Sequence, residues 1–283
     1  MARTRRAPET RTAPVDSGLA ELQADPDRAQ AWTLLVDGAP QSLVDLADPA
    51  YLGFSYQRRL GHVVDLVAPA GAPVQVVHLG GGALTMARYT AHTRPRSTQT
   101  VVELDTALTE LVRRELPWDR NWRIKVRGGD ARAGLAKLPD ASAHLVIADA
   151  FTGARTPAHL TTLEFLHEVR RVLRPDGHYA VNLTDGGPLG FARGQSATVG
   201  AAFAEVVLAA EPAVLRGKRF GNLMLWAAAQ PLPLPAFTRL LATDPHQSRT
   251  VHGPALTAFT AGAAAVTDAT ATASPEPPEH AFG

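Results

Sequence analysis

The middle of the chain alternates between two hydrophobic patterns. Short apolar runs, typical of buried strands, are separated by segments whose apolar residues recur at helical spacing. The runs predict strands over residues 74–79, 100–104, 123–127, 144–148 and 178–183. The segments between them predict helices over 83–92, 107–116, 131–138 and 162–173. This alternation indicates a mostly parallel sheet covered by helices.

The flanks of this repeat have different patterns. Before it, residues 31–46 form a predicted hairpin around the turn pair Asp37-Gly38, and a helix is predicted from Asp48-Pro49 to Val67. After it, a long helix over 192–210 precedes two predicted strands, 213–216 and 222–228. A closing hairpin is typical of class I methyltransferase folds. We therefore predict an α/β fold with a seven-stranded, Rossmann-like sheet, a terminal β-hairpin and a small N-terminal β-hairpin.

Shifts in composition divide the chain into five predicted parts. We expect a disordered basic tail over 1–30, the N-terminal hairpin and helix over 31–72, and a nucleoside-binding α/β domain over 73–230. A C-terminal extension over 231–270 contains a predicted pair of helices. The Pro- and Ala-rich residues 271–283 are expected to be a disordered tail.

Charge and composition exclude several classes of protein. The 28 basic and 27 acidic side chains give a net charge of +1, so nothing draws the whole chain to nucleic acid or to an anionic membrane. No apolar run is long enough to span a bilayer. The chain contains no cysteine, which fits a cytoplasmic protein. A basic arm that binds nucleic acid remains the alternative to a disordered tail for the arginines at the N-terminus, Arg3, Arg5, Arg6 and Arg11.

Three motifs follow the first three predicted strands of the repeat. Gly80-Gly81-Gly82 allows the backbone to turn sharply and to approach a ligand closely. Glu103 lies at the end of the second strand, where a carboxylate can accept both hydroxyls of a ribose. Gly129-Asp130-Ala131 follows the third strand, where Asp130 either binds the amine of an adenine or caps a helix. Together the three motifs predict a site for an adenosine-type ligand.

These motifs resemble those of the spermidine synthase (polyamine aminopropyltransferase) family. The hairpin with Gln41, Val77-His78-Leu79-Gly80-Gly81-Gly82, Val102-Glu103-Leu104-Asp105, Gly129-Asp130-Ala131 and Ile147-Ala148-Asp149 all match family motifs. The resemblance implies that S-adenosylmethionine or its decarboxylated form is the co-substrate. It implies that the donor is bound by Gln41, Gly80, Gly81, Gly82, Glu103, Asp130 and Ala131. It also implies a small-molecule acceptor and a homodimer.

The chain departs from the family at positions that bind the polyamine. The family has Asp after the three glycines and a second Asp after the fourth strand, whereas this chain has Ala83 and Thr152. Its Tyr-His-Glu appears as Tyr56-Gln57-Arg58, followed by Arg59. Fewer carboxylates and more arginines would make the site less negative and less suited to a cationic acceptor, provided that these side chains line it.

The chemistry that remains requires a proton acceptor beside the donor. Asp149, at the end of the fourth strand, is the predicted general base for in-line transfer of an alkyl group, although it could instead cap the following loop. The predicted acceptor-binding residues are Tyr56, Phe151, Thr152 and Asp185. His78 is more typical of a buried core histidine. We recognise no cluster of metal ligands and expect no metal cofactor.

Two further functions remain open on the sequence alone. A catalytically silent nucleoside-binding protein would keep Glu103 and Asp130 but lack turnover. A nicotinamide-dependent oxidoreductase fits less well, because Thr85 stands where its glycine fingerprint ends in Gly or Ala. The leading hypothesis is a spermidine synthase-like transferase that moves an aminopropyl or methyl group to a small molecule.

Overall fold

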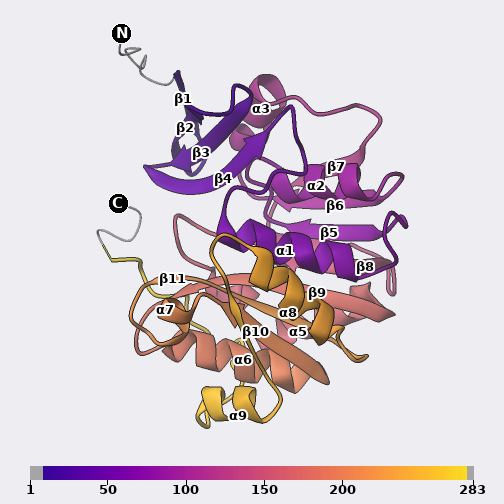
Figure 1. Ribbon diagram of the computed structural model, residues 1–283, viewed down its shortest axis with the longest axis vertical. Coiled ribbons are helices and arrows are strands. Elements are labelled where there is room, and N and C mark those ends of the chain that lie inside the picture. The colour runs from indigo at the N-terminus through magenta and orange to yellow at the C-terminus, as the bar shows by residue number, and fades with distance from the viewer. Residues whose placement is uncertain (1–8, 279–283) are drawn as a thin grey trace.

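Two β-sheets form the framework of the protein. The computed structural model describes residues 9–278, and Figure 1 shows the smaller sheet above the larger one. The expected roles of Arg3, Arg5 and Arg6 and of the last five residues lie outside the described range. The larger sheet contains eight strands. In spatial order they are β12 (Arg249–His252), β10 (Glu205–Ala210), β11 (Gly221–Ala228), β9 (Leu173–Asp185), β8 (Ala143–Ala148), β5 (Gln75–Leu79), β6 (Thr98–Glu103) and β7 (Arg123–Gly128).

The five central strands of the repeat are confirmed. β5 pairs in parallel with β6 and β8, β6 with β7, and β8 with β9, so the carboxyl ends of all five strands meet at one edge. The second strand of the closing hairpin, predicted over 222–228, is confirmed as β11, whereas the first strand was predicted in the wrong place. The predicted helix over 192–210 ends at Ala202, and its last residues, Glu205–Ala210, form β10 against β11. Val206 and Val207 favour a strand, and residues 212–215 form a short helix that begins at Pro212. β12 adds an eighth strand that was not predicted.

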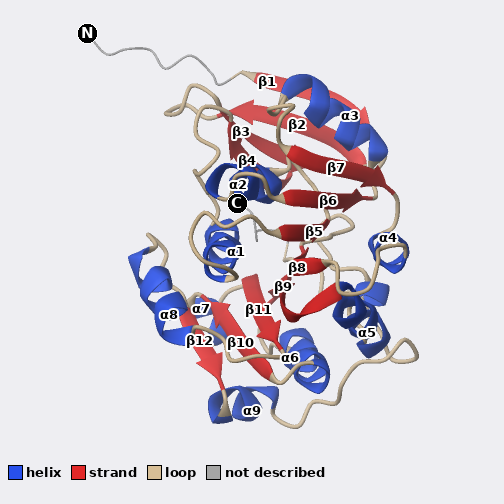
Figure 2. Cartoon of the chain, turned by 90° about the vertical axis from the view of Figure 1, so that its right-hand side faces the viewer, coloured by secondary structure: helices blue, strands red, loops and turns tan. Residues whose placement is uncertain are grey.

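Helices cover both faces of the larger sheet. Figure 2 shows α1 (Ser55–Leu66), α2 (Thr85–Thr93) and α8 (Leu234–Thr243) on one face, and α4 (Ala131–Ala136), α5 (Leu163–Val172) and α6 (Gly190–Ala202) on the other. The first helix starts at Ser55, later than predicted, because Phe54 occupies the N-cap and Gln57 accepts its backbone N–H. The remaining helices are α3 (Thr106–Glu115), α7 (Pro212–Leu215), α9 (Pro254–Thr260) and a 3₁₀ turn, η1 (Ala158–Leu160). Helices α8 and α9 confirm the predicted pair in the extension.

The N-terminal sheet is larger than the predicted hairpin. It contains β1 (Thr10–Val15), β2 (Gly18–Ala24), β3 (Ala31–Val36) and β4 (Ala39–Asp45) in chain order. The hairpin over 31–46 is confirmed as β3 and β4. The expectation of disorder was wrong for residues 10–24. Ala20 and Leu22 of β2 are fully buried in the core that this sheet forms with α2 and α3. Strand β1 pairs with β2, and its Ala13 and Val15 are partly buried against the same core.

The C-terminal segment also differs from the prediction. Residues 271–278 form no helix or strand, but they pack on the protein instead of being disordered. Ser274 is fully buried, donates its backbone N–H to Thr156 and accepts the N–H of Thr156 on its hydroxyl oxygen. Within residues 9–278, no helix has the length and apolar character needed to cross a membrane.

Candidate active site

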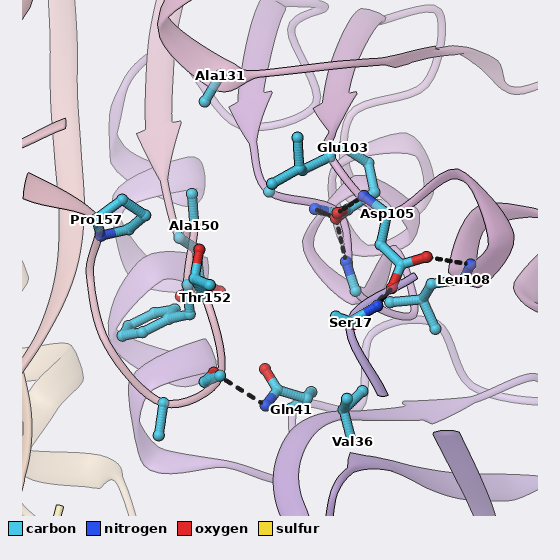
Figure 3. A pocket seen from close by; sticks show the side chains of 18 of the residues that line it. Ser17, Val36, Gln41, Glu103, Asp105, Leu108, Ala131, Ala150, Thr152 and Pro157 are labelled. Atoms are coloured by element: carbon cyan, nitrogen blue, oxygen red, sulfur yellow. Dashed lines mark hydrogen bonds between the residues drawn. The ribbon is translucent and has the colours of Figure 1, made fainter. Parts of the chain in front are cut away.

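A cavity of about 340 Å³ opens at the carboxyl edge of the larger sheet. It lies under the N-terminal sheet, and Figure 3 shows Ser17, Val36 and Gln41 of that sheet across the cavity from Ala150 and Thr152. Residues that follow β5, β6, β7 and β8 line it, together with the ends of β9 and β11. The carboxyl edge of a parallel sheet is the usual ligand site in open α/β folds.

The glycine turn and Glu103 form one hydrogen-bonded unit. The Glu103 Oε2 atom accepts the backbone N–H groups of Gly81, at 2.7 Å, and Gly82, at 3.3 Å (Figure 3). Gly80 has a φ of +94°, and a Cβ atom there would lie 2.2 Å from the Asp149 carbonyl oxygen. The turn therefore requires glycine at position 80, because both the backbone conformation and the close contact with β8 exclude a side chain.

Asp130 caps a helix and also lines the cavity. Its Oδ1 atom accepts the backbone N–H of Ala133 at 2.8 Å, and its Oδ2 atom lies 2.6 Å from the Nε2 atom of His159. Burial raises the pKa of Asp130, but the hydrogen bonds from Ala133 and His159 hold it below its ordinary value. His159 was not predicted, because a single exposed histidine 29 residues along the chain carries no sequence signal.

Asp105 fastens the N-terminal sheet to the cavity. Its carboxylate accepts the backbone N–H groups of Asp16, Ser17 and Leu108 and the hydroxyl of Ser17 (Figure 3). Although burial raises the pKa of this carboxyl, the hydrogen bonds from Ser17 and Leu108 bring it below its ordinary value. The β1–β2 turn thus forms part of the cavity wall. Asp16 and Ser17 are not among the predicted site residues, because residues 1–30 are expected to be disordered.

Asp149 lies in the middle of the cavity wall, directly after β8. Its Oδ1 atom accepts a hydrogen bond of 2.9 Å from the Asn182 amide. Burial raises the pKa of Asp149 to about 6, with a smaller contribution from the charge of Glu103, while the Asn182 hydrogen bond lowers it. A carboxyl group with a pKa near 6 is ionised at neutral pH and still basic enough to take a proton from an amine.

Tyr56 and Gln41 connect the N-terminal sheet to the loop after β8. The Tyr56 hydroxyl donates to the Gln41 carbonyl oxygen at 2.8 Å, and the Gln41 side-chain amide reaches the Gly153 carbonyl oxygen at 3.5 Å. Burial, and then the charge of Asp149, raise the pKa of Tyr56 well above its ordinary value, so this phenol stays neutral. Phe151 and Thr152, on the same loop, also line the cavity.

Several residues singled out in the sequence lie away from the cavity. Asp185, predicted to bind the acceptor, accepts the backbone N–H groups of Gly186 and Ala192 at the start of α6 and does not line the cavity. Ala83 is fully buried in the apolar core beneath the N-terminal sheet. His78 is a buried core residue bonded to Gln99, as expected.

Neither arginine of α1 lines the cavity. Arg58 donates to the Leu52 carbonyl oxygen, and Arg59 is buried and bonded to the Ser248 hydroxyl and the Asn222 carbonyl oxygen. The charge of the cavity therefore differs from the expected one. Its described lining has five carboxylates and neither lysine nor arginine; the acidic side chains are Asp16, Glu103, Asp105, Asp130 and Asp149. The cavity is suited to a cation.

Comparison with known proteins agrees with this geometry. The family model for the spermine/spermidine synthase domain matches residues 53–184. A curated polyamine aminopropyltransferase from Vibrio vulnificus is 30% identical over 119 residues, which are 41% of this chain and 39% of that protein. The match therefore spans well under half of the curated relative.

Solved structures extend the similarity to nearly the whole chain. The crystal structure of a probable spermidine synthase from Corynebacterium glutamicum has a TM-score of 0.85 and 33% identity, covering 92% of this chain and 97% of the other. Spermidine synthase from Thermotoga maritima (TM-score 0.60, 16% identity, 82% of this chain and 77% of the other) shares the fold. So does human methyltransferase-like protein 13 (TM-score 0.53, 18% identity, 76% and 96%). The chain belongs to the spermine/spermidine synthase family and has the class I methyltransferase-like fold.

Proposed function

We propose that the protein transfers an aminopropyl group from decarboxylated S-adenosylmethionine to a small-molecule amine, with Asp149 as general base. The nitrogen lone pair of the amine attacks the carbon attached to the sulfonium. A carbon–nitrogen bond forms as the carbon–sulfur bond breaks, and sulfur keeps the bonding electrons as a neutral thioether. The nitrogen loses its proton to the Asp149 carboxylate.

The proposed donor site follows the order of the strands. Glu103 and the glycine turn would hold the ribose, and Asp130, on the far side of β6, would face the adenine amine. Leu104 is 61% exposed and lines the cavity between them, where it could pack on the face of the base. Burial beneath a ligand would remove this apolar surface from water.

The charge of the lining favours the decarboxylated donor over S-adenosylmethionine itself. The intact donor carries a carboxylate, and the described lining offers no lysine or arginine to pair with it. The decarboxylated donor carries an ammonium and a sulfonium, both of which suit the acidic wall. A methyl transfer from the intact donor, which the sequence alone left open, is therefore the less favoured reaction.

The position and pKa of Asp149 carry the proposal. The carboxylate is buried, is oriented by Asn182, and lies between the proposed donor site and the ends of β9 and β11. A structural cap would have its oxygens saturated by nearby backbone N–H groups, as those of Asp185 are. Asp149 accepts one side-chain hydrogen bond from the described residues and keeps lone pairs free for a proton.

Calorimetric titration tests the donor. We expect the decarboxylated donor to bind at least about tenfold more tightly than S-adenosylmethionine, and Glu103→Gln to weaken its binding by a similar factor. Glu21→Gln, a matched change on β2 outside the cavity, should leave binding unchanged. Tighter binding of intact S-adenosylmethionine would contradict aminopropyl transfer and indicate methyl transfer as the reaction. Binding of neither donor below about 1 mM would refute the adenosine site.

A further inference from the structure

The carboxylates of the cavity lie on one side of Asp149. The sheet order places β7, β6 and β5 on the donor side of β8, and β9 and β11 on the opposite side. On that opposite side the cavity is lined by Asn182 and Thr184 of β9 and Asn222 of β11, where Asn222 pairs directly with Thr184. None of these side chains is charged. The acceptor side therefore holds one carboxylate, Asp149, and beyond it a neutral polar surface.

A short acceptor is long enough to reach from Asp149 to this neutral surface. Neighbouring strands lie about 4.8 Å apart, so β9 and β11 are about 5 to 10 Å from Asp149 across the sheet. The two ends of an extended chain of four carbons with a terminal group at each end are about 6 Å apart. An amine held at Asp149 would thus place its other end against Thr184 and Asn222.

A second ammonium at that position would have no carboxylate to pair with in the described lining. The nearest carboxylate in sequence, Asp185, points away, because adjacent residues of a strand face opposite sides, and its oxygens already accept two backbone N–H groups. Behind the surface, the buried Arg59 guanidinium donates to the Asn222 carbonyl oxygen at 3.2 Å. The charge behind Asn222 is therefore positive, although the carboxylates of Glu211 and Asp244 partly offset it, and it does not attract a second cation in front of it.

The neutral surface offers hydrogen bonds instead. Asn182 is only 3% exposed, and its Oδ1 atom has no hydrogen-bond partner among the described residues, although the residue lines the cavity. Buried polar atoms are normally paired, so a ligand donor is expected here. Thr184 makes one long hydrogen bond, 3.4 Å, to the Ala154 carbonyl oxygen, which leaves its oxygen able to accept another. A hydroxyl group can donate to one of these two oxygens and accept from the side-chain amide of Asn222, which lines the same surface, whereas an ammonium can only donate.

We propose that the acceptor is a monoamine with an uncharged hydroxyl-bearing tail, an amino alcohol, and not a diamine. The inference rests on the proposed function, because it takes Asp149 as the base that receives the proton of the amine. Transfer to such an acceptor would give a secondary amine, a neutral thioether nucleoside and a proton on Asp149. The hydroxyl would stay intact.

A matched pair of acceptors tests the inference. 4-Amino-1-butanol and 1,4-diaminobutane have the same length and differ only in one terminal group. With the decarboxylated donor, we expect kcat/KM for thioether release to be at least about tenfold higher with the amino alcohol. Equal or better use of the diamine would overturn the inference and leave the proposed function in place. A protein that binds the donor but releases thioether with neither amine would refute the proposed function, and the inference with it.

Adding a negative charge to the neutral surface gives a second, independent readout. Asn222→Asp places a carboxylate where the second ammonium would lie, so the ratio of kcat/KM for diamine over amino alcohol should rise at least about tenfold. Asn121→Asp makes the same change in net charge at an exposed position outside the cavity and should leave the ratio unchanged. An unchanged ratio in Asn222→Asp would show that the far end of the acceptor does not lie at Asn222 and would overturn the inference.

Discussion

Replacing Asn182 with alanine should raise the pKa of the proposed base. The Asn182 amide donates to Asp149 Oδ1 at 2.9 Å and stabilises the ionised carboxylate. Burial already raises the pKa of Asp149 to about 6, and this hydrogen bond works against that shift. Without it, the carboxylate is less stable, and protonation begins at higher pH.

The size of the shift follows from the energy of the hydrogen bond. A hydrogen bond to a charged group contributes about 1.5 to 3 kcal/mol, and one pKa unit corresponds to about 1.4 kcal/mol. The pKa of Asp149 in Asn182→Ala should therefore rise by about one to two units. At pH 7 the ionised fraction of the base should fall about two- to tenfold.

The pH dependence of kcat/KM measures this shift. Its acidic limb reports the pKa of the base in the free enzyme, so the limb should move to higher pH by about one to two units in Asn182→Ala. Asn222→Ala removes an amide from the same cavity that does not contact Asp149, and its limb should not move. An acidic limb unchanged within about 0.3 units in Asn182→Ala would refute the assignment of this limb to Asp149.

Three other substitutions test the framework of the site. Because burial raises the pKa of Asp149 to about 6, its ionised form lowers the free energy of unfolding by about 3 kcal/mol above that pH. Asp149→Asn should therefore unfold at a higher urea concentration than wild type at pH 8, and the gain in stability should be much smaller at pH 4. Gly80→Ala, at a φ of +94° and against the Asp149 carbonyl, should lower the free energy of unfolding by about 3 kcal/mol, measured in urea. Asp105→Ala should lower it by about 2 to 4 kcal/mol and expose residues 10–24 to proteolysis, since it frees the β1–β2 turn; cleavage equal to wild type would contradict this.

The parallel core was predictable because its signals are local. Each central strand is a short apolar run, and the functional motifs follow the strand ends directly. The sequence therefore predicts that Gly80, Glu103, Asp130 and Asp149 lie at one edge of the sheet. The helix over 192–210 is predicted too long because residues 201–204 contain neither Gly nor Pro to mark its end. Glu205–Ala210 instead pair with β11, which the pattern of the segment alone does not show.

Features that depend on distant contacts were not predictable. Strand β1 and the segment around Ser274 have few large apolar side chains, and contacts far along the chain help to order both: Arg11 bonds to Glu115, and Ser274 bonds to Thr156. The same holds for His159 beside Asp130 and for Ser17 on Asp105. The charge of the cavity also differs from the prediction. Residues 58, 59 and 83 would change that charge only if their side chains lined the cavity, and the sequence alone does not show that they lie elsewhere.

One variant tests the central claim most directly. Asp149→Asn keeps the shape of the side chain but removes its basicity. We expect it to bind the decarboxylated donor within about threefold of wild type, and to release thioether at least about a hundredfold more slowly at pH 7. Wild-type turnover in Asp149→Asn would contradict the role of Asp149 as general base. Absence of turnover in both proteins, with donor binding retained, would instead indicate a nucleoside-binding protein without catalysis.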